Sequence, residues 1–206
     1  MKLMYSPGAC SVGIHILLEE IGKPYEAVLT SLKDKANYTP DFVKINPKSK
    51  VPTLVRDDGS VLTEFPAIAY WLAKTNPGAH LLPDDVDGQT KAIEAMDYAT
   101  ATIHMQGFTR IARPGNFTPN AADEERVKER GAEIMTNGLA LMDKALEGKE
   151  WIAGTYSVGD AALFYVEFWY AKRMNRELPP NCAAHFARML ARPAVKRVME
   201  KEGLPH

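Results

Sequence analysis

Apolar residues in the first 30 positions alternate between strand-like and helix-like spacing. Residues 2–5 form a short run that is apolar apart from Lys2 and that Ser6-Pro7-Gly8 ends. The next apolar residues recur at intervals of three and four, as on one face of a helix that ends at Gly22; they are Ile14, Leu17, Leu18 and Ile21. An extended run over 25–29 follows Pro24. The pattern therefore predicts a β–α–β unit.

A second group of elements surrounds the turn at Asp57-Asp58-Gly59. Residues typical of strands stand on both sides of it, at 53–55 and 61–62, which predicts a hairpin. Thr63 is the expected N-cap of a following helix, and Pro66 falls in the first turn, where a missing N–H is harmless. With a weak helix or loop over 38–45, the order becomes βαβ-ββα. This is the pattern of a thioredoxin-like α/β domain.

Strand patterns disappear beyond the turn at residues 75–78. Helical periodicity covers 88–111, with an interruption at Gly107, and then 122–146; further helices are expected after Tyr156, over 182–190 and over 193–202. We therefore expect an α/β domain over 1–76, a linker over 77–87 and an all-α domain over 88–206. Ser157-Val158-Gly159-Asp160 has the spacing of a capping box before a helix that is apolar all round, which predicts a buried central helix.

Composition narrows the possible functions. The 206 residues carry a formal net charge of -1 with both signs interspersed, so we expect neither a nucleic-acid partner nor a membrane partner. Two cysteines give no disulfide framework, and the N-terminus lacks the pattern of a signal peptide; both favour a cytoplasmic protein. The five histidines are dispersed without ligand spacing, so we expect no metal.

Cys10 is the strongest candidate for chemistry. It follows a strand and a Pro-Gly turn at the expected start of a helix, where the positive end of the helix dipole favours a thiolate. Gly13 stands where a second cysteine of a dithiol motif would be, so the sequence argues against self-contained dithiol exchange. Ser11 beside it either donates to a sulfur or caps the helix.

Two further residues point to an extended peptide ligand. If the Val51–Pro52 bond is cis, the N–H and C=O of Val51 turn outward and are available to pair with such a peptide. Glu64 stands at the start of the next helix, where backbone N–H groups favour a bound carboxylate.

These motifs, in this order, resemble the cytosolic glutathione transferases. The segment from Met1 to Ser11 is similar to the bacterial beta class, and Ile45-Asn46-Pro47-Lys48-Ser49-Lys50-Val51-Pro52 and Ser157-Val158-Gly159-Asp160 match the same family. The resemblance implies a cytoplasmic, homodimeric detoxification enzyme with glutathione as co-substrate. It implies Cys10 and Ser11 as catalytic residues and the following glutathione contacts: Lys33, Lys35, Val51, Pro52, Glu64, Phe65 and His104.

This chain departs from the family's pattern in two places. Phe65 and Pro66 follow Glu64 where the family has a small or hydroxyl residue, so a side-chain contact to glutathione is lost while the Phe65 N–H is kept. Gln106 stands where the family has a lysine after His104. The expected pocket for a hydrophobic electrophile is lined by apolar residues of the helical domain: Met105, Phe108, Ile111, Phe117, Phe164 and Phe168.

Three functions follow from these observations. The first is a glutathione transferase, in which the thiolate of bound glutathione attacks a hydrophobic electrophile. The second is a glutathione-dependent thiol-disulfide reductase or peroxidase with Cys10 as nucleophile. The third is a non-catalytic binding scaffold, which the departure at Phe65-Pro66 favours.

Overall fold

The computed structural model describes residues 1–205 and divides the chain into two compact units. The first unit contains residues 1–82 and the C-terminal stretch from Arg188 onward, and the second contains residues 83–187. The chain thus divides a few residues beyond 76. The last helix lies with the first unit, whereas the sequence led us to expect it in the helical domain.

The first unit is built on a four-stranded sheet of order β2-β1-β3-β4. β1 pairs parallel with β2 and antiparallel with β3, and β3 pairs antiparallel with β4. The strands are β1 (Lys2–Tyr5), β2 (Glu26–Leu29), β3 (Thr53–Val55) and β4 (Val61–Thr63). The parallel crossover from β1 to β2 and the β3–β4 hairpin confirm the expected thioredoxin-like order.

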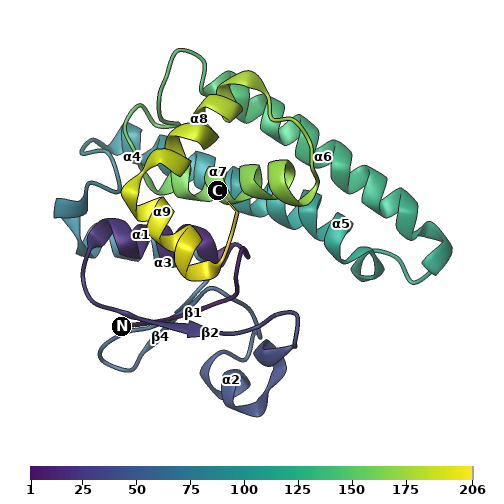
Figure 1. The fold of residues 1–206 in the computed structure, drawn as a ribbon, viewed down its shortest axis with the longest axis horizontal. Coiled ribbons are helices and arrows are strands. Elements are labelled where there is room, and N and C mark those ends of the chain that lie inside the picture. Colours follow the sequence, from purple (N-terminus) through teal and green to yellow (C-terminus); the bar gives the residue numbers. More distant parts are fainter. Residues whose placement is uncertain (206) are drawn as a thin grey trace. The chain divides into compact units, whose positions relative to one another are not determined.

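Helices cover this sheet (Figure 1). They are α1 (Ser11–Ile21), the short η1 (Ala36–Tyr38), α2 (Pro40–Ile45), α3 (Phe65–Thr75), the short η2 (Pro77–Ala79) and α9 (Pro193–Glu202). Figure 1 shows α1, α3 and α9 on one side of the strands and α2 on the other, with α9 packed beside α1. Ile14, Leu17 and Leu18 of the predicted periodicity are buried, whereas Ile21 is only partly buried. Val12 and Ile16 are buried as well, so α1 packs on more than the one predicted face.

The second unit is helical throughout. Its helices are α4 (Val86–Asp97), the π-helical η3 (Tyr98–Phe108), the short α5 (Thr109–Ala112), α6 (Glu124–Ala145), α7 (Val158–Phe168), the short π-helical η6 (Trp169–Arg173) and α8 (Pro180–Ala191). Two single turns, η4 (Pro114–Asn116) and η5 (Ala121–Asp123), connect α5 to α6. The fold class of an α/β domain and a helical region is thereby confirmed.

Gly107 does not interrupt the long helix as we expected. The chain stays helical through it, and Gly107 lies at the point where η3 packs against α6. A Cβ at Gly107 would lie 2.7 Å from the Met135 side chain, and one at Gly131 would lie 2.7 Å from the carbonyl oxygen of Gly107. The two glycines therefore allow the two helix backbones to approach closely.

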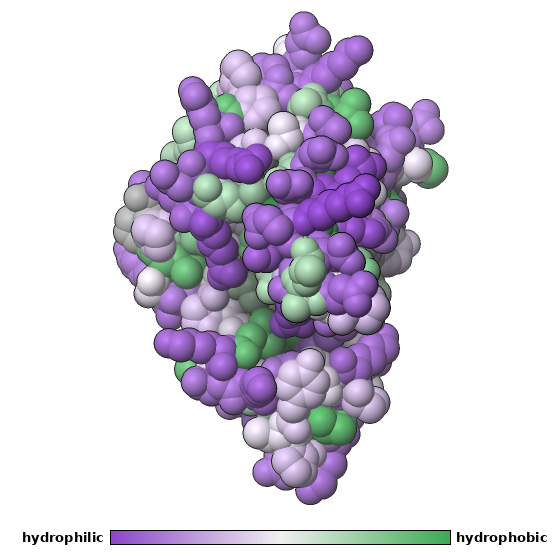
Figure 2. Space-filling view, turned by 90° about the vertical axis from the view of Figure 1, so that its right-hand side faces the viewer, coloured by the Kyte–Doolittle hydropathy of each residue, from purple (hydrophilic) through white to green (hydrophobic). Residues whose placement is uncertain are grey.

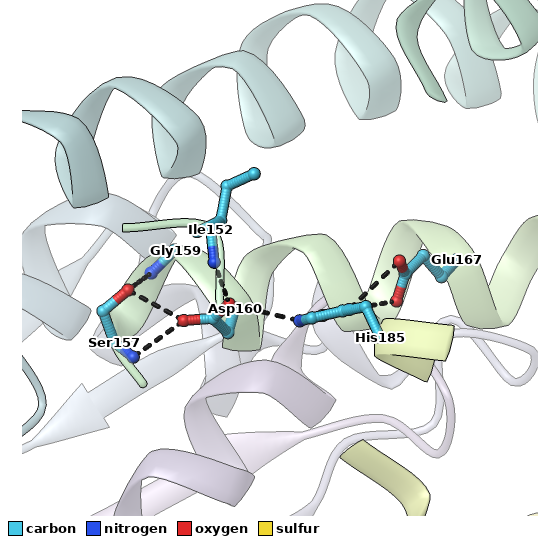
Figure 3. Close-up of polar contacts among 6 residues, drawn as sticks. All are labelled: Ile152, Ser157, Gly159, Asp160, Glu167 and His185. Atoms are coloured by element: carbon cyan, nitrogen blue, oxygen red, sulfur yellow. Dashed lines mark hydrogen bonds and ion pairs between the residues drawn. The ribbon is translucent and has the colours of Figure 1, made fainter. Parts of the chain in front are cut away.

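The predicted capping box is present at the start of α7 (Figure 3). The Ser157 hydroxyl accepts from the N–H of Gly159, and the Asp160 carboxylate accepts from the N–H of Ser157 at 2.8 Å. Asp160 also accepts from the N–H of Ile152, which secures the preceding loop. All residues of α7 are buried, as its apolar run predicted.

A buried histidine joins this cap to the far end of α7. His185 of α8 contacts Asp160 at 3.2 Å through Nε2 and Glu167 at 2.9 Å through Nδ1, and all three side chains are fully buried (Figure 3). Burial alone would lower the pKa of His185, but Glu167 and Asp160 outweigh it and raise that pKa to about 10. Burial also raises the pKa of Glu167, which the charge of His185 opposes. The imidazolium is therefore the charge that makes two buried carboxylates tolerable.

Replacing His185 by Gln should lower the free energy of unfolding by about 3–5 kcal/mol, because it removes the positive partner of two buried carboxylates. The folded-state pKa lies above the ordinary value of 6.5, so this stabilisation is complete below pH 6.5 and is lost as the pH rises through about 10. Urea unfolding at pH 6 and pH 9 measures it. The exposed His80→Gln is the control; a His185→Gln variant as stable as this control would contradict the assignment.

A second ionic cluster attaches α9 to the rest of the first unit. The Glu19 carboxylate accepts from Arg197 Nε at 2.7 Å, from Lys201 Nζ at 2.6 Å and from the Tyr25 hydroxyl. Burial would raise the pKa of Glu19, but the hydrogen bonds from Lys201, Tyr25 and Arg197 outweigh it and lower the pKa to about 2.

Glu19→Gln should lower the free energy of unfolding by about 1.5–3 kcal/mol at pH 7, the range for hydrogen bonds to charged groups. Because the pKa is depressed in the folded state, the loss should be fully visible above pH 4.5 and should shrink as the pH falls toward 2. Urea midpoints of wild type and variant between pH 7 and pH 3.5 test this, with the exposed Glu26→Gln as control. A loss that is independent of pH would refute the linkage.

Candidate functional site

Cys10 lies at the N-terminus of α1 and is half-buried. The helix begins at Ser11, so Cys10 occupies the N-cap position, as the sequence predicted. Its Sγ donates to the carbonyl oxygen of Val51 at 3.4 Å. The thiol therefore lies between the positive end of a helix and the backbone of the segment that leads into β3.

The Val51–Pro52 peptide bond is cis. Both residues are buried, and the loop before them is secured by Asn46, whose amide donates to the Lys50 carbonyl at 2.9 Å and to Thr53 Oγ1 at 2.8 Å. Asn46 was part of the recognised motif, but its role did not follow from the sequence. Asn46 is 1% exposed, and its side-chain bonds satisfy the requirement that a buried amide be paired.

Ser11 has a different role from the two we expected. Its side chain is fully buried, and its hydroxyl donates to the carbonyl oxygen of Ser6 and accepts from the Ser6 N–H, both at 3.2 Å. It therefore closes the loop between β1 and α1 and does not cap the helix. These bonds fix the backbone next to Cys10.

Glu64 is the N-cap residue of α3, where we expected Thr63. Its backbone has φ +69, a conformation that residues other than glycine rarely adopt. Its side chain is exposed and pairs with Lys48, whose Nζ lies 2.7 Å from Glu64 Oε1 and donates to Thr63 Oγ1 at 2.9 Å. α3 then starts at Phe65, with Pro66 in the first turn as predicted.

In the first turn of α3, Phe65 and Ala67 carry backbone N–H groups and Pro66 carries none, and the charges of Lys48 and Glu64 lie beside this turn. The Phe65 side chain, in contrast, is buried. The position can therefore bind an anionic group through its backbone and an ammonium through the Glu64 carboxylate. Lys48 is a charged residue of this site that sequence reasoning did not assign.

Lys33 and Lys35 are exposed in the loop after β2. Lys35 has a left-handed backbone with φ 56 and precedes η1. The Lys35 backbone donates to the Leu32 carbonyl at 3.3 Å and accepts from the Tyr38 N–H at 2.9 Å, which shapes the loop and leaves both lysine side chains at its surface. They remain candidate contacts for a negatively charged ligand.

Tyr5, at the end of β1, has its ring 5.1 Å from that of His15. Burial, followed by the Glu202 carboxylate, raises the pKa of its phenol. The phenol therefore stays protonated.

Three candidate residues of the second unit, His104, Met105 and Phe108, lie in the π-helical η3, and two of them contact Trp169, the first residue of the π-helical η6. His104 is half-buried, its Nδ1 lies 3.4 Å from the Tyr165 hydroxyl, and its ring packs edge-on against Trp169 at 4.7 Å. Phe108 stacks on the same indole at 4.2 Å. Widened π-helical turns often occur at functional sites.

The six residues expected to line an apolar pocket fall into two groups. Met105 and Phe117 are exposed by 40% and 39%, and Phe108 and Ile111 are partly exposed. Phe164 and Phe168, in contrast, are core side chains with 0% and 3% exposure, and Phe164 stacks on Phe186 at 5.4 Å. The expectation was wrong for these two, because a helix buried on every side uses its aromatic residues for packing.

Cys182 is buried, and its Sγ donates to the Leu139 carbonyl at 3.5 Å. Burial, with the nearby Glu167 and Asp143 carboxylates, raises the pKa of this thiol. It is therefore a core residue. Within residues 1–205, no group of three or more histidine, cysteine or acidic side chains is arranged to hold a metal ion.

Comparison with known proteins adds to this geometry. Residues 8–75 match the family model of the glutathione S-transferase N-terminal domain. Glutathione S-transferase GstA of Escherichia coli O157:H7 is 38% identical over 208 residues, which cover 99% of this chain and 100% of that protein.

Two solved structures are similar over the whole chain. A bacterial beta class glutathione S-transferase from Sphingomonas chungbukensis is 34% identical, with a TM-score of 0.83 and 100% of each chain covered. A sphingomonad glutathione S-transferase complexed with glutathione is 33% identical, with a TM-score of 0.85 and again 100% of each chain covered.

Proposed function

Because the chain belongs to the glutathione S-transferase family, we propose that it transfers glutathione to hydrophobic electrophiles. The observation that carries the proposal is the position of Cys10, with its Sγ 3.4 Å from the Val51 carbonyl at the start of α1. The glutathione bound in the similar sphingomonad structure supports it. A thiol peptide beside Val51 would have its sulfur near the positive end of that helix, which favours its thiolate.

The proposed contacts follow the charges of glutathione. The Val51 backbone pairs with the cysteinyl part, in the manner of an added strand. Glu64 binds the γ-glutamyl ammonium, and the N–H groups at the start of α3 bind the adjacent carboxylate. Lys33 and Lys35 bind the glycyl carboxylate.

In the reaction, the glutathione sulfur forms a bond to an electrophilic carbon, and the leaving group departs with its electron pair. We propose that Cys10 donates a hydrogen bond to that sulfur and is not itself consumed. We assign the electrophile to the exposed and partly exposed apolar side chains of the second unit: Met105, Phe108, Ile111 and Phe117. His104 stays a candidate positioning residue through its contact with Trp169.

Substituting Cys10 by Ala separates this function from a thiol-disulfide reductase. We expect conjugation to an aromatic halide to fall by about tenfold at most, because one hydrogen bond contributes about 0.5–1.5 kcal/mol. A reductase with Cys10 as nucleophile would instead lose disulfide reduction completely and show little conjugation in the wild type. Cys182→Ala is the matched control, since it removes a thiol that is buried in the core.

Calorimetry with glutathione tests the non-catalytic scaffold. A transferase should bind glutathione with a measurable heat at millimolar ligand, and the absence of any heat would favour the scaffold. The start of α3 offers backbone N–H groups that do not depend on the identity of the Phe65 side chain, so we expect binding.

We also propose that the enzyme is a homodimeric, cytoplasmic detoxification enzyme. Apolar side chains of α4 and α6 are exposed, Ile93 by 37% and Leu141 by 58%, and they suit an interface between copies. On the face drawn in Figure 2, hydrophobic side chains are scattered among hydrophilic ones. No helix within residues 1–205 has both the length and the apolar character needed to cross a membrane.

Light scattering at micromolar concentration should give twice the monomer mass of 22.8 kDa. Leu141→Glu should shift the population toward monomer, because a buried unpaired charge is costly at an interface. The control is Tyr38→Glu, which adds a charge at an exposed aromatic position of the first unit, away from α4 and α6. A wild type with the mass of a monomer in light scattering would refute the proposed homodimer.

A further inference from the structure

The end of α9 carries a carboxylate in an unfavourable place. Glu202 is the last residue of the helix, and its side chain is fully buried. Burial disfavours the charged form, and the carbonyl groups at a helix C-terminus repel negative charge. A carboxylate in such a place requires specific partners.

The structure provides two partners, one for each oxygen. His15 Nδ1 lies 2.7 Å from Glu202 Oε1, and the backbone N–H of Gly8 donates to Glu202 Oε2 at 2.8 Å. Gly8 is 194 residues away in sequence and belongs to the loop over residues 6–10 that ends at Cys10. The C-terminal helix therefore reaches the loop that positions the reactive thiol.

His15 orients this carboxylate. It is fully buried in the middle of α1, between the rings of Tyr5 at 5.1 Å and Tyr25 at 5.7 Å. Its Nε2 has no hydrogen-bond partner. An unpaired acceptor costs less here than an unpaired N–H, so we assign the proton to Nδ1, which donates to Glu202.

The loop over residues 6–10 is held from two sides. On one side, Ser6 is bonded to Ser11, and the Ala9 N–H donates to the Ser6 carbonyl at 2.9 Å. On the other side, Gly8 has a left-handed backbone with φ 63 and a buried N–H, for which Glu202 is the acceptor. A buried N–H must be paired, so this bond selects the loop conformation two residues before Cys10.

We propose that Glu202, oriented by His15, is a positioning residue: it fixes the Gly8 amide and thereby holds the Cys10 thiol at the start of α1. The effect of Glu202 on turnover rests on the proposed transferase function, whereas its effect on the position of the Cys10 thiol does not. A displacement of about 1 Å at a reacting group can cost up to ~10²-fold in rate. Loss of one of the two attachments of the loop should cost less than that.

The test uses the full chain with Glu202→Ala, which removes both bonds. We expect the rate of Cys10 alkylation by iodoacetamide at pH 7 to fall about fivefold, and kcat for conjugation to fall by less than the loss of about tenfold at most that is expected for Cys10→Ala. KM for the electrophile should stay unchanged. Glu202→Gln keeps an oxygen for the Gly8 N–H, so it should recover most of both rates.

Arg197→Gln is the matched control, because Arg197 attaches α9 to Glu19 without a bond to the loop. It should lower the unfolding midpoint but leave the alkylation rate unchanged. If Arg197→Gln slows alkylation as much as Glu202→Ala does, the effect comes from helix attachment and the inference is overturned. An unchanged alkylation rate in folded Glu202→Ala also overturns it.

Hydrogen exchange decides the case in which Glu202→Ala does not fold. In the wild type, the Gly8 amide should be protected as strongly as the amides of α9; exchange at the rate of an exposed loop amide would overturn the inference. A wild type that shows this protection but binds no glutathione would refute the proposed function and leave the positioning of Cys10 intact.

Discussion

The whole site of the first unit depends on pairing the backbone of the loop between β1 and α1. A strand that ends beside a helix N-terminus leaves several N–H groups pointing inward, and each needs an acceptor when it is buried. The chain meets this demand locally through Ser11 and remotely through Glu202. Because the loop is held at both sides, Cys10 has one position, and that position faces the Val51 carbonyl.

The requirement that a buried polar group must have a partner also applies to the buried charges of both units. In the second unit, His185 lies between Asp160 and Glu167. In the first unit, His15 contacts Glu202. Each arrangement connects elements distant in sequence, and each would be costly if one partner were lost. A buried pair of this kind gives little net attraction beyond the desolvation it must offset, so its weight in the fold is the cost of removing one partner.

Local patterns predicted much of this structure, and long-range contacts account for what they missed. The hairpin, the capping box at Ser157 and the helix start at Cys10 depend on neighbours within a few residues, so spacing was sufficient to find them. The bond from Glu202 to Gly8 spans 194 residues, and periodicity carries no trace of it. Phe164 was misassigned to a pocket because an apolar residue in a helix has the same spacing whether it packs in the core or lines a cavity.

The two units would recognise their ligands through different groups: backbone groups in the first unit and apolar side chains in the second. In the first, the proposed contacts come mainly from backbone groups at Val51 and at the start of α3, so a side-chain change such as Phe65 leaves the peptide-binding groups in place. In the second, the exposed surface consists of side chains such as Met105 and Phe117. Substitutions there alter shape and apolar area directly. The choice of electrophile should therefore follow these side chains, while binding of the thiol peptide should tolerate their change.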